Sequence, residues 1–368
     1  MTKIKAIILL IFSFGSAYGQ TLPPKQAYPL DVKQIHSGHS LTDPLFGPWP
    51  GQYVELISEL RSTWAGDEIV KATIPGSGMF WRWDHENDLS PSARYNIDDF
   101  ELLVITEAVP LTQITNSNEH LSLYVNNAWN NGNNGNGAAT LLWTTWTNID
   151  DSDGPWRQTL DDYESLWEEM QDYANANRPN GSTPVYLIPG HRMMARIYDD
   201  IQLNLVPGIT NINQLFSDNI HPNSLGAYAI TMIHYACVYN QSPVGLPNDL
   251  MANPPSGFQT PSPELSAYLQ NIIWEIVTNY SRTGITDTSL SISETEAILN
   301  DTSIYPNPTK DIIYIKNEDL NNNLEKTIYD IKGNILYNGS DNKINIGHFS
   351  SGIYILKIGN RNIKLVKH

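Results

Sequence analysis

Short strand-like runs alternate with longer helical stretches between residues 32 and 280, and this alternation limits the possible folds more than any other feature. The runs of strand character cover residues 32–37, 68–74, 100–106, 139–146 and 185–188. The helical stretches cover residues 53–63, 119–129, 160–176, 225–239 and 263–280. Strands separated by helices favour a parallel sheet covered on both faces. We therefore expect a three-layer α/β/α sandwich with a five-stranded parallel sheet.

The amino-terminal end has the pattern of an export signal. Lys3 and Lys5 precede an apolar run over residues 6–14, and small residues lead up to Gly19. This order predicts a cleavable signal peptide over residues 1–19. The run is shorter than the roughly 20 apolar residues of a membrane span, and no other stretch is long enough, so we expect no membrane span. The α/β domain is then expected over residues 20–283.

The carboxyl-terminal part has a different pattern. Residues 284–300 are polar and without periodicity, which predicts a linker. In residues 301–368, strand-like runs such as 312–315, 327–331 and 353–358 alternate with turn residues. Regular short strands of this kind predict a small β-sandwich.

Charge and cysteine content narrow the possible partners and environment. The chain has 39 Asp and Glu against 22 Lys and Arg, a net charge of −17, and the excess lies before residue 301. An acidic body repels nucleic acid and anionic membranes, so we expect neither as a partner. Cys237 is the single cysteine, which rules out an intramolecular disulfide. Its apolar neighbours favour a buried packing residue.

Two segments contain the residue types of a nucleophilic site. Ser40 follows the first strand on a turn that contains Gly38, where an α/β sheet presents side chains to ligands. His221 and Asp218 lie just before the helical stretch that begins at residue 225. A serine needs a base to attack a carbonyl, and an aspartate can hold the base in the correct tautomer. We therefore predict Ser40 as nucleophile, His221 as base and Asp218 as its orienting partner.

These blocks, in this order, resemble the SGNH or GDSL-type hydrolases over roughly residues 30–240. Gly38-His39-Ser40-Leu41 is similar to the family's first block, and Asp218 to Pro222 to its last, Asp-x-x-His-Pro. The resemblance implies a flavodoxin-like sheet, ester hydrolysis and no cofactor. It also implies an oxyanion hole formed by the backbone N–H groups of Ser40 and Gly76, with Gly78 as the other choice for the glycine.

The sequence departs from the family pattern at two positions. His39 replaces the acidic residue of the first block, and Glu107 follows the third strand where the family has an asparagine that donates to the oxyanion. A carboxylate would repel a developing oxyanion, so Glu107 cannot take over that role. Glu107 could instead pair with Arg192 or bind a sugar hydroxyl. The candidates for a replacement donor are Asn126, Asn127, His191 and Arg192.

A metal site is an alternative use of the histidines near the nucleophile. Its candidate ligands are His36, His39, Asp43 and His221. On a strand, however, His36 and His39 would point to opposite faces, so we expect no bound metal.

Tryptophans in or near the loops after the strands bear on the substrate. They are Trp81, Trp83, Trp129, Trp143, Trp146 and Trp156. Aromatic faces beside Asn and Asp suit sugar rings, and the alternative for each ring is a place in the core. We count Trp146, with His39, Glu107, His191 and Arg192, as a candidate for contact with the substrate or for support of the site.

The last residues resemble a type IX secretion sorting domain over 301–368. The similarity rests on Tyr305-Pro306-Asn307-Pro308, on residues 329–333 and on residues 351–355. It implies the type IX secretion machinery as a partner and export through the periplasm and outer membrane. The whole sequence thus predicts a secreted or surface-attached serine esterase that acts on acylated carbohydrate, most simply acetylated. The alternatives are a catalytically lapsed carbohydrate-binding protein and an acyltransferase.

Overall fold

The computed structural model describes residues 22–42, 69–85, 91–249, 257, 259–286, 303–316, 326–330, 334–358 and 361–368. The predicted signal peptide, Asp43, the predicted helix over 53–63 and most of the predicted linker lie outside these residues. The chain divides into two compact units, Met1–Thr286 and Asp287–His368.

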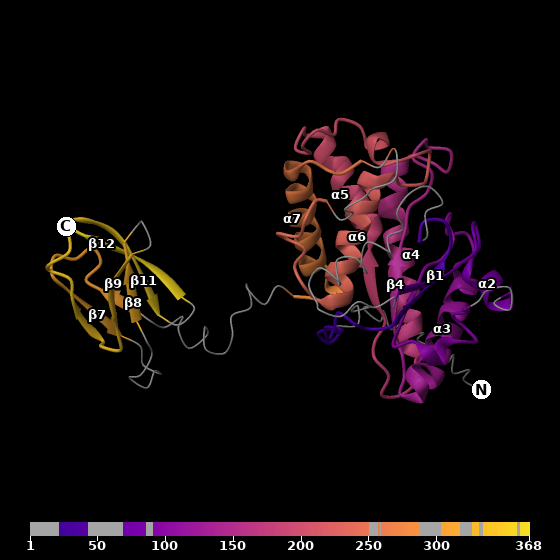
Figure 1. Ribbon diagram of the computed structural model, residues 1–368, viewed down its shortest axis with the longest axis horizontal. Helices are drawn as coiled ribbons and strands as arrows, with labels where there is room; N and C mark the ends of the chain where they lie inside the picture. Colours follow the sequence, from indigo (N-terminus) through magenta and orange to yellow (C-terminus); the bar gives the residue numbers. More distant parts are fainter. Residues whose placement is uncertain are drawn as a thin grey trace, which may run out of the picture. The chain divides into compact units, whose positions relative to one another are not determined.

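A five-stranded parallel sheet forms the centre of the first unit (Figure 1). Its strands are β1 (Gln34–Gly38), β2 (Ile69–Thr73), β3 (Leu102–Ile105), β4 (Ala139–Thr144) and β5 (Tyr186–Pro189). They lie in the order β2-β1-β3-β4-β5. Because β2 and β3 flank β1, the chain changes direction across the sheet there, and ligands of such sheets bind where the carboxyl ends of these strands meet.

Helices cover both faces of this sheet, as the sequence predicted (Figure 1). They are α2 (Met79–His85), α3 (Ile114–Asn131), α4 (Trp156–Asn177), α5 (Gly190–Gln202), α6 (Ser224–Tyr239) and α7 (Pro263–Asn279). Short 3-10 turns are η2 (Ile97–Asp99), η3 (Asn133–Gly135), η4 (Ile212–Leu215) and η5 (Ser281–Thr283). In the part of the chain that the structure describes, no helix has both the length and the apolar character needed to cross a bilayer.

The two faces of the sheet carry separate apolar cores. Val104 and Ile188 belong to a core that includes residues of α5, α6 and α7. Leu103 and Leu187, their sequence neighbours, belong to a core built with α3 and α4. This alternation of side chains is what a parallel strand buried on both faces requires, and it confirms the predicted three layers.

Cys237 is buried inside α6, as predicted. Burial raises the pKa of its thiol to about 12, so the thiolate form of this cysteine is strongly disfavoured.

Two helices were not predicted, and two predicted helices begin earlier than expected, α3 at Ile114 in place of residue 119 and α4 at Trp156 in place of residue 160. The helix α2 has only seven residues, too few to give a clear periodic pattern. The helix α5 begins directly after the strand at Pro189-Gly190, a pair that normally signals a turn. The helix α4 begins at Trp156, ahead of the expected residue 160, because the carboxylate of Asp151 accepts a hydrogen bond from the Trp156 N–H at 2.7 Å.

The second unit contains two antiparallel sheets. One has the order β10-β7-β6, from Lys343–Asn345, Ile312–Lys316 and Ser303–Tyr305. The other has the order β12-β11-β8-β9, from Arg361–Lys367, Gly352–Ile358, Lys326–Tyr329 and Ile335–Gly339. Ile313 and Ile344 of the first sheet share one buried core with Ile328 and Leu356 of the second. The unit is the small β-rich module that the sequence predicted.

Candidate active site

Ser40 lies on a tight turn at the carboxyl end of β1. The N–H of Thr42 donates to the carbonyl of His39 at 2.8 Å, which closes the turn around the serine. Ser40 remains half-buried at the carboxyl end of β1, beside the end of the neighbouring strand β3.

The loop that carries His221 is fixed at several points. An isolated bridge pairs Phe216 with Pro222, and the N–H of Ser217 donates to the carbonyl of His221 at 2.8 Å. The indole N–H of Trp146 donates to the carbonyl of Ile220 at 3.0 Å. These contacts hold the backbone on both sides of the imidazole, so its position does not depend on the side chain alone.

The structure brings Ser40, His221 and Asp218 together in one line of hydrogen bonds. His221 Nε2 lies 2.8 Å from Ser40 Oγ, and His221 Nδ1 lies 2.7 Å from Asp218 Oδ2. Asp218 Oδ1 also accepts from the N–H groups of Ile220 and His221, at 2.9 Å and 2.7 Å. Burial raises the pKa of Asp218, but these hydrogen bonds outweigh it and lower that pKa below its usual value. An ionised Asp218 fixes Nδ1 as the protonated nitrogen and leaves Nε2 free to take a proton from Ser40.

Gly76 lies on the loop after β2, close to the end of β1. The N–H of Ile74 donates to the carbonyl of Gly38 at 3.0 Å, and the N–H of Ser77 donates back to Ile74 at 3.2 Å. The resulting turn has Pro75 second and Gly76 third, with φ +69° at Gly76, the arrangement of a type II turn. Within the described residues, neither the Ser40 N–H nor the Gly76 N–H has a hydrogen-bond acceptor. Two N–H groups of this kind are what an oxyanion hole needs.

His39 connects the Ser40 turn to the end of β3. Its Nδ1 accepts from the N–H of Leu41 at 3.3 Å, and its Nε2 lies 3.0 Å from the carbonyl of Glu107. Burial above all, and then the charge of Arg82, lower the pKa of His39 to about 4. A neutral His39 therefore donates from Nε2 to Glu107 and supports the loop without adding charge beside Ser40.

Arg82, which was not predicted as a site residue, connects three segments around the site through hydrogen bonds. It is fully buried on α2. Its guanidinium donates to the carbonyl of Ser77 at 2.6 Å, to the hydroxyl of Ser37 at 3.2 Å and to the carbonyl of Thr106. One side chain thereby joins the ends of β1 and β3 to the Gly76 loop. The available signal was an arginine four residues after Gly78, flanked by aromatic residues.

Glu107 lies at the end of β3 and is 4% exposed. Its Oε1 accepts from the N–H of Met79 at 2.9 Å and from its neighbour Ala108 at 2.7 Å. The proposed pairing of Glu107 with Arg192 is wrong, because Arg192 donates to Glu164 at 2.6 Å.

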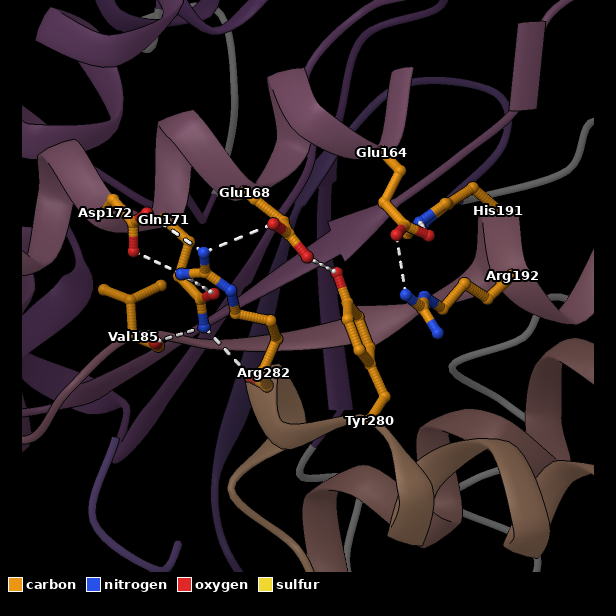
Figure 2. A network of polar contacts seen from close by, with 9 residues as sticks. All are labelled: Glu164, Glu168, Gln171, Asp172, Val185, His191, Arg192, Tyr280 and Arg282. Atoms are coloured by element: carbon orange, nitrogen blue, oxygen red, sulfur yellow. Dashed lines mark hydrogen bonds and ion pairs between the residues drawn. The ribbon is translucent and has the colours of Figure 1, made fainter. Parts of the chain in front are cut away.

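His191 and Arg192 belong to a polar network between α4, α5 and the end of α7 (Figure 2). His191 Nδ1 lies 2.7 Å from the hydroxyl of Thr144, and its Nε2 lies 3.4 Å from Glu164. The guanidinium of Arg192 stacks 3.7 Å from the ring centre of Tyr280. Both candidates point into this contact between helices, so neither supplies the missing oxyanion donor.

The same network continues along α4. The hydroxyl of Tyr280 donates to Glu168 at 2.7 Å, and Arg282 pairs with Asp172 and with Glu168 (Figure 2). The amide of Gln171 donates to the carbonyls of Val185 and Arg282, each at 2.9 Å. These contacts tie η5 to α4 and β5 and have a structural role.

The other candidate donors and several tryptophans are engaged elsewhere. The amides of Asn126 and Asn127 donate to the carbonyls of Ser122 and Arg94, at 2.7 Å and 2.8 Å. Trp146 is fully buried, which excludes it as a substrate platform and leaves it the supporting contact with Ile220. Among the residues that the structure describes, the buried tryptophans fill the core; they are Trp143, Trp146, Trp156 and Trp167.

The histidines of the alternative metal site are held apart. His36 stacks against His234 with ring centres 5.9 Å apart, whereas His39 faces Glu107. Among the residues described, no three His, Cys, Asp or Glu side chains form a group suited to a metal ion.

Comparison with known families identifies the second unit. Residues 303–368 match the family described as the secretion system C-terminal sorting domain, which confirms the predicted sorting domain. The match indicates delivery to the cell surface or the exterior by the type IX secretion machinery. No curated protein matches the chain at significant similarity.

Solved structures similar to this chain include three that align with slightly more than half of it. A candidate SGNH hydrolase from Slackia heliotrinireducens aligns at 16% identity, over 55% of this chain and 97% of its own, with a TM-score of 0.37. An acetyl xylan esterase, AlAXEase, aligns at 15% identity over 56% and 99%, with a TM-score of 0.39. TesA aligns at 16% identity over 55% and 95%, with a TM-score of 0.35.

Proposed function

We propose that this chain is a secreted serine esterase that hydrolyses acyl esters, most simply acetyl esters, on carbohydrate. The observation that carries the proposal is the line of hydrogen bonds from Ser40 through His221 to Asp218, at 2.8 Å and 2.7 Å. Nucleophile, base and orienting carboxylate at these distances suit acyl transfer through a covalent intermediate.

The reaction proceeds in two steps. Ser40 Oγ attacks the acyl carbonyl while His221 Nε2 takes the hydroxyl proton, and the N–H groups of Ser40 and Gly76 donate to the oxygen that gains charge. The intermediate collapses, the bond to the sugar oxygen breaks, and His221 returns the proton to that oxygen. Water then attacks the acyl-enzyme with His221 again as base, which releases the acid and restores Ser40.

The carbohydrate part of the proposal rests on location and surface chemistry. A sorting domain over 303–368 indicates a place of action outside the cell or on its surface, where acylated polymers are available. The pocket beside Gly76 combines Phe80 and Trp81 with the polar side chains of Gln113 and Ser117. Aromatic faces with hydrogen-bonding groups suit sugar rings better than lipid chains.

Substitution of the nucleophile tests the proposal. Ser40→Ala is expected to lower kcat for p-nitrophenyl acetate, and acetate release from acetylated polysaccharide, by at least about 10³-fold while the melting temperature stays unchanged. Full activity in Ser40→Ala contradicts the proposal. Glycan binding with no turnover of any ester would identify a lapsed binding protein, and transfer of the acyl group to a sugar hydroxyl would identify an acyltransferase.

A further inference from the structure

A pocket of about 320 Å³ opens beside the Gly76 loop, at the carboxyl ends of β2 and β3. Pro75 and Gly76 form one wall, and Phe80 and Leu111 contribute apolar surface. This volume lies at the lower end of the range for pockets that bind small molecules, about 300–1,000 Å³. Gly76 lines the pocket and carries a proposed oxyanion N–H, which connects this pocket to the proposed position of the reacting carbonyl.

A buried carboxylate also lines this pocket. Glu107 is held in place through Oε1, which accepts from the N–H groups of Met79 and Ala108. Its Oε2 is buried and has no hydrogen-bond partner among the residues described. Buried polar atoms in folded proteins nearly always have a partner, and a carboxylate oxygen accepts hydrogen bonds. A ligand hydroxyl in the pocket would satisfy this atom.

Gly78 allows the carboxylate to take this position. A Cβ at residue 78 would lie 2.8 Å from Glu107 Oε1, closer than such atoms approach in proteins. Glu107 is thus held by the donors to Oε1, in space that a side chain at residue 78 would fill. A fixed carboxylate selects ligands by geometry better than a mobile one, because its orientation is set before binding.

We propose that Glu107 is a specificity-determining residue that accepts a hydrogen bond from a free hydroxyl of the substrate, next to the ester that Ser40 attacks. This inference rests on the proposed esterase function and names its substrate class: esters of polyhydroxylated alcohols with an unsubstituted hydroxyl near the acyl group. The ring lies against Phe80 and Trp81, and its hydroxyl donates to Glu107 Oε2. Glu107 cannot stabilise the oxyanion, but in this arrangement it binds the alcohol part of the substrate.

The first experiment uses two substrates and no variant. One is a mono-O-acetyl methyl glycoside with a free hydroxyl beside the ester, and the other is the same compound with that hydroxyl methylated. The full-length wild type is expected to prefer the free hydroxyl in kcat/KM by about 10- to 100-fold, the range for a hydrogen bond to a charged group. Equal kcat/KM for the two compounds overturns the proposal, even if no variant folds.

The second experiment measures the same preference in Glu107→Gln. Glutamine keeps the shape and an oxygen for the Met79 and Ala108 N–H groups, but it turns an NH₂ toward the pocket where the carboxylate presents an acceptor. The ratio of kcat/KM between the free and the methylated glycoside is expected to fall to about threefold or less. The matched control is Glu119→Gln, which removes an exposed carboxylate of α3 and is expected to retain the preference.

The outcomes separate this inference from the esterase proposal. Loss of hydrolysis of both glycosides in Ser40→Ala, with an unchanged preference in a folded Glu107→Gln, leaves the esterase standing and overturns the role of Glu107. If Glu107→Gln raised kcat/KM for butyryl esters relative to acetyl esters, the pocket would hold the acyl chain, and the proposed role of Glu107 would likewise be overturned. Full hydrolysis in Ser40→Ala contradicts the esterase itself.

Discussion

Asp218→Asn separates the orientation of His221 from the stability of its loop. In the wild type, Asp218 Oδ1 accepts from two backbone N–H groups, and Oδ2 accepts from His221 Nδ1 at 2.7 Å. Asparagine keeps one oxygen for the backbone donors, so we expect the free energy of unfolding to change by less than about 1 kcal/mol. The amide NH₂ then faces Nδ1, which favours the tautomer with the proton on Nε2. That tautomer cannot accept the proton of Ser40.

The size of the effect follows from the exposure of the pair. In a buried triad the same change lowers kcat by about 10⁴-fold. Here 41% of the Asp218 side chain is exposed, against 17% for His221, so water can partly restore the correct tautomer. We therefore expect a loss of about 10³-fold, or about 4 kcal/mol of transition-state stabilisation.

Steady-state hydrolysis of p-nitrophenyl acetate by the variant, with urea unfolding as the control, measures both quantities. A kcat within about threefold of the wild type would refute the role of Asp218. A loss of about 4 kcal/mol in the free energy of unfolding, as large as the expected loss of transition-state stabilisation, would mean that the substitution acts through the loop.

Two further predictions follow from the site and its surroundings. Four buried histidines have pKa values that burial lowers, to about 4 for His39 and His234; they are His36, His39, His191 and His234. Because the folded state binds fewer protons than the unfolded state, their contribution to stability is complete above about pH 6.5 and is lost as the pH falls toward 4. At pH 5 the loss is about 2 kcal/mol for each of His39 and His234, and a melting temperature that is constant from pH 8 to pH 5 would contradict this. Gly76→Ala meets no atom within 4 Å of the new Cβ but must hold φ +69°, so we expect a loss of about 1–2 kcal/mol in stability and at least tenfold in kcat/KM. Wild-type kcat/KM in that variant would exclude the Gly76 N–H as an oxyanion donor.

The strands and the Ser40–His221 pair could be predicted because local pattern and general topology are enough to place them. The strands β3, β4 and β5 are apolar runs, and each of the five strands lies within about two residues of its predicted bounds. Ser40 and His221 are 181 residues apart, yet the first follows a strand and the second precedes a helix, and both positions lie at the carboxyl edge of a parallel sheet.

The surroundings of the site could not be predicted because they depend on the directions of side chains. His191 follows β5 as Ser40 follows β1, but the course of α5 turns it toward Thr144 and Glu164. Trp146 follows β4 and is covered by the loop that it supports. Arg82 acts on three segments that meet only in the folded chain. No spacing in the sequence encodes these contacts.

Covalent labelling of Ser40 tests the central claim most directly. The full-length protein is treated with a fluorophosphonate, and the adduct is located by mass spectrometry of its peptides. We expect a single adduct, on Ser40, with labelling slowed by at least about 10²-fold in His221→Ala, because the hydroxyl is activated by the imidazole 2.8 Å away. Absence of an adduct on Ser40, or labelling that His221→Ala leaves unchanged, would contradict a Ser40–His221 nucleophile.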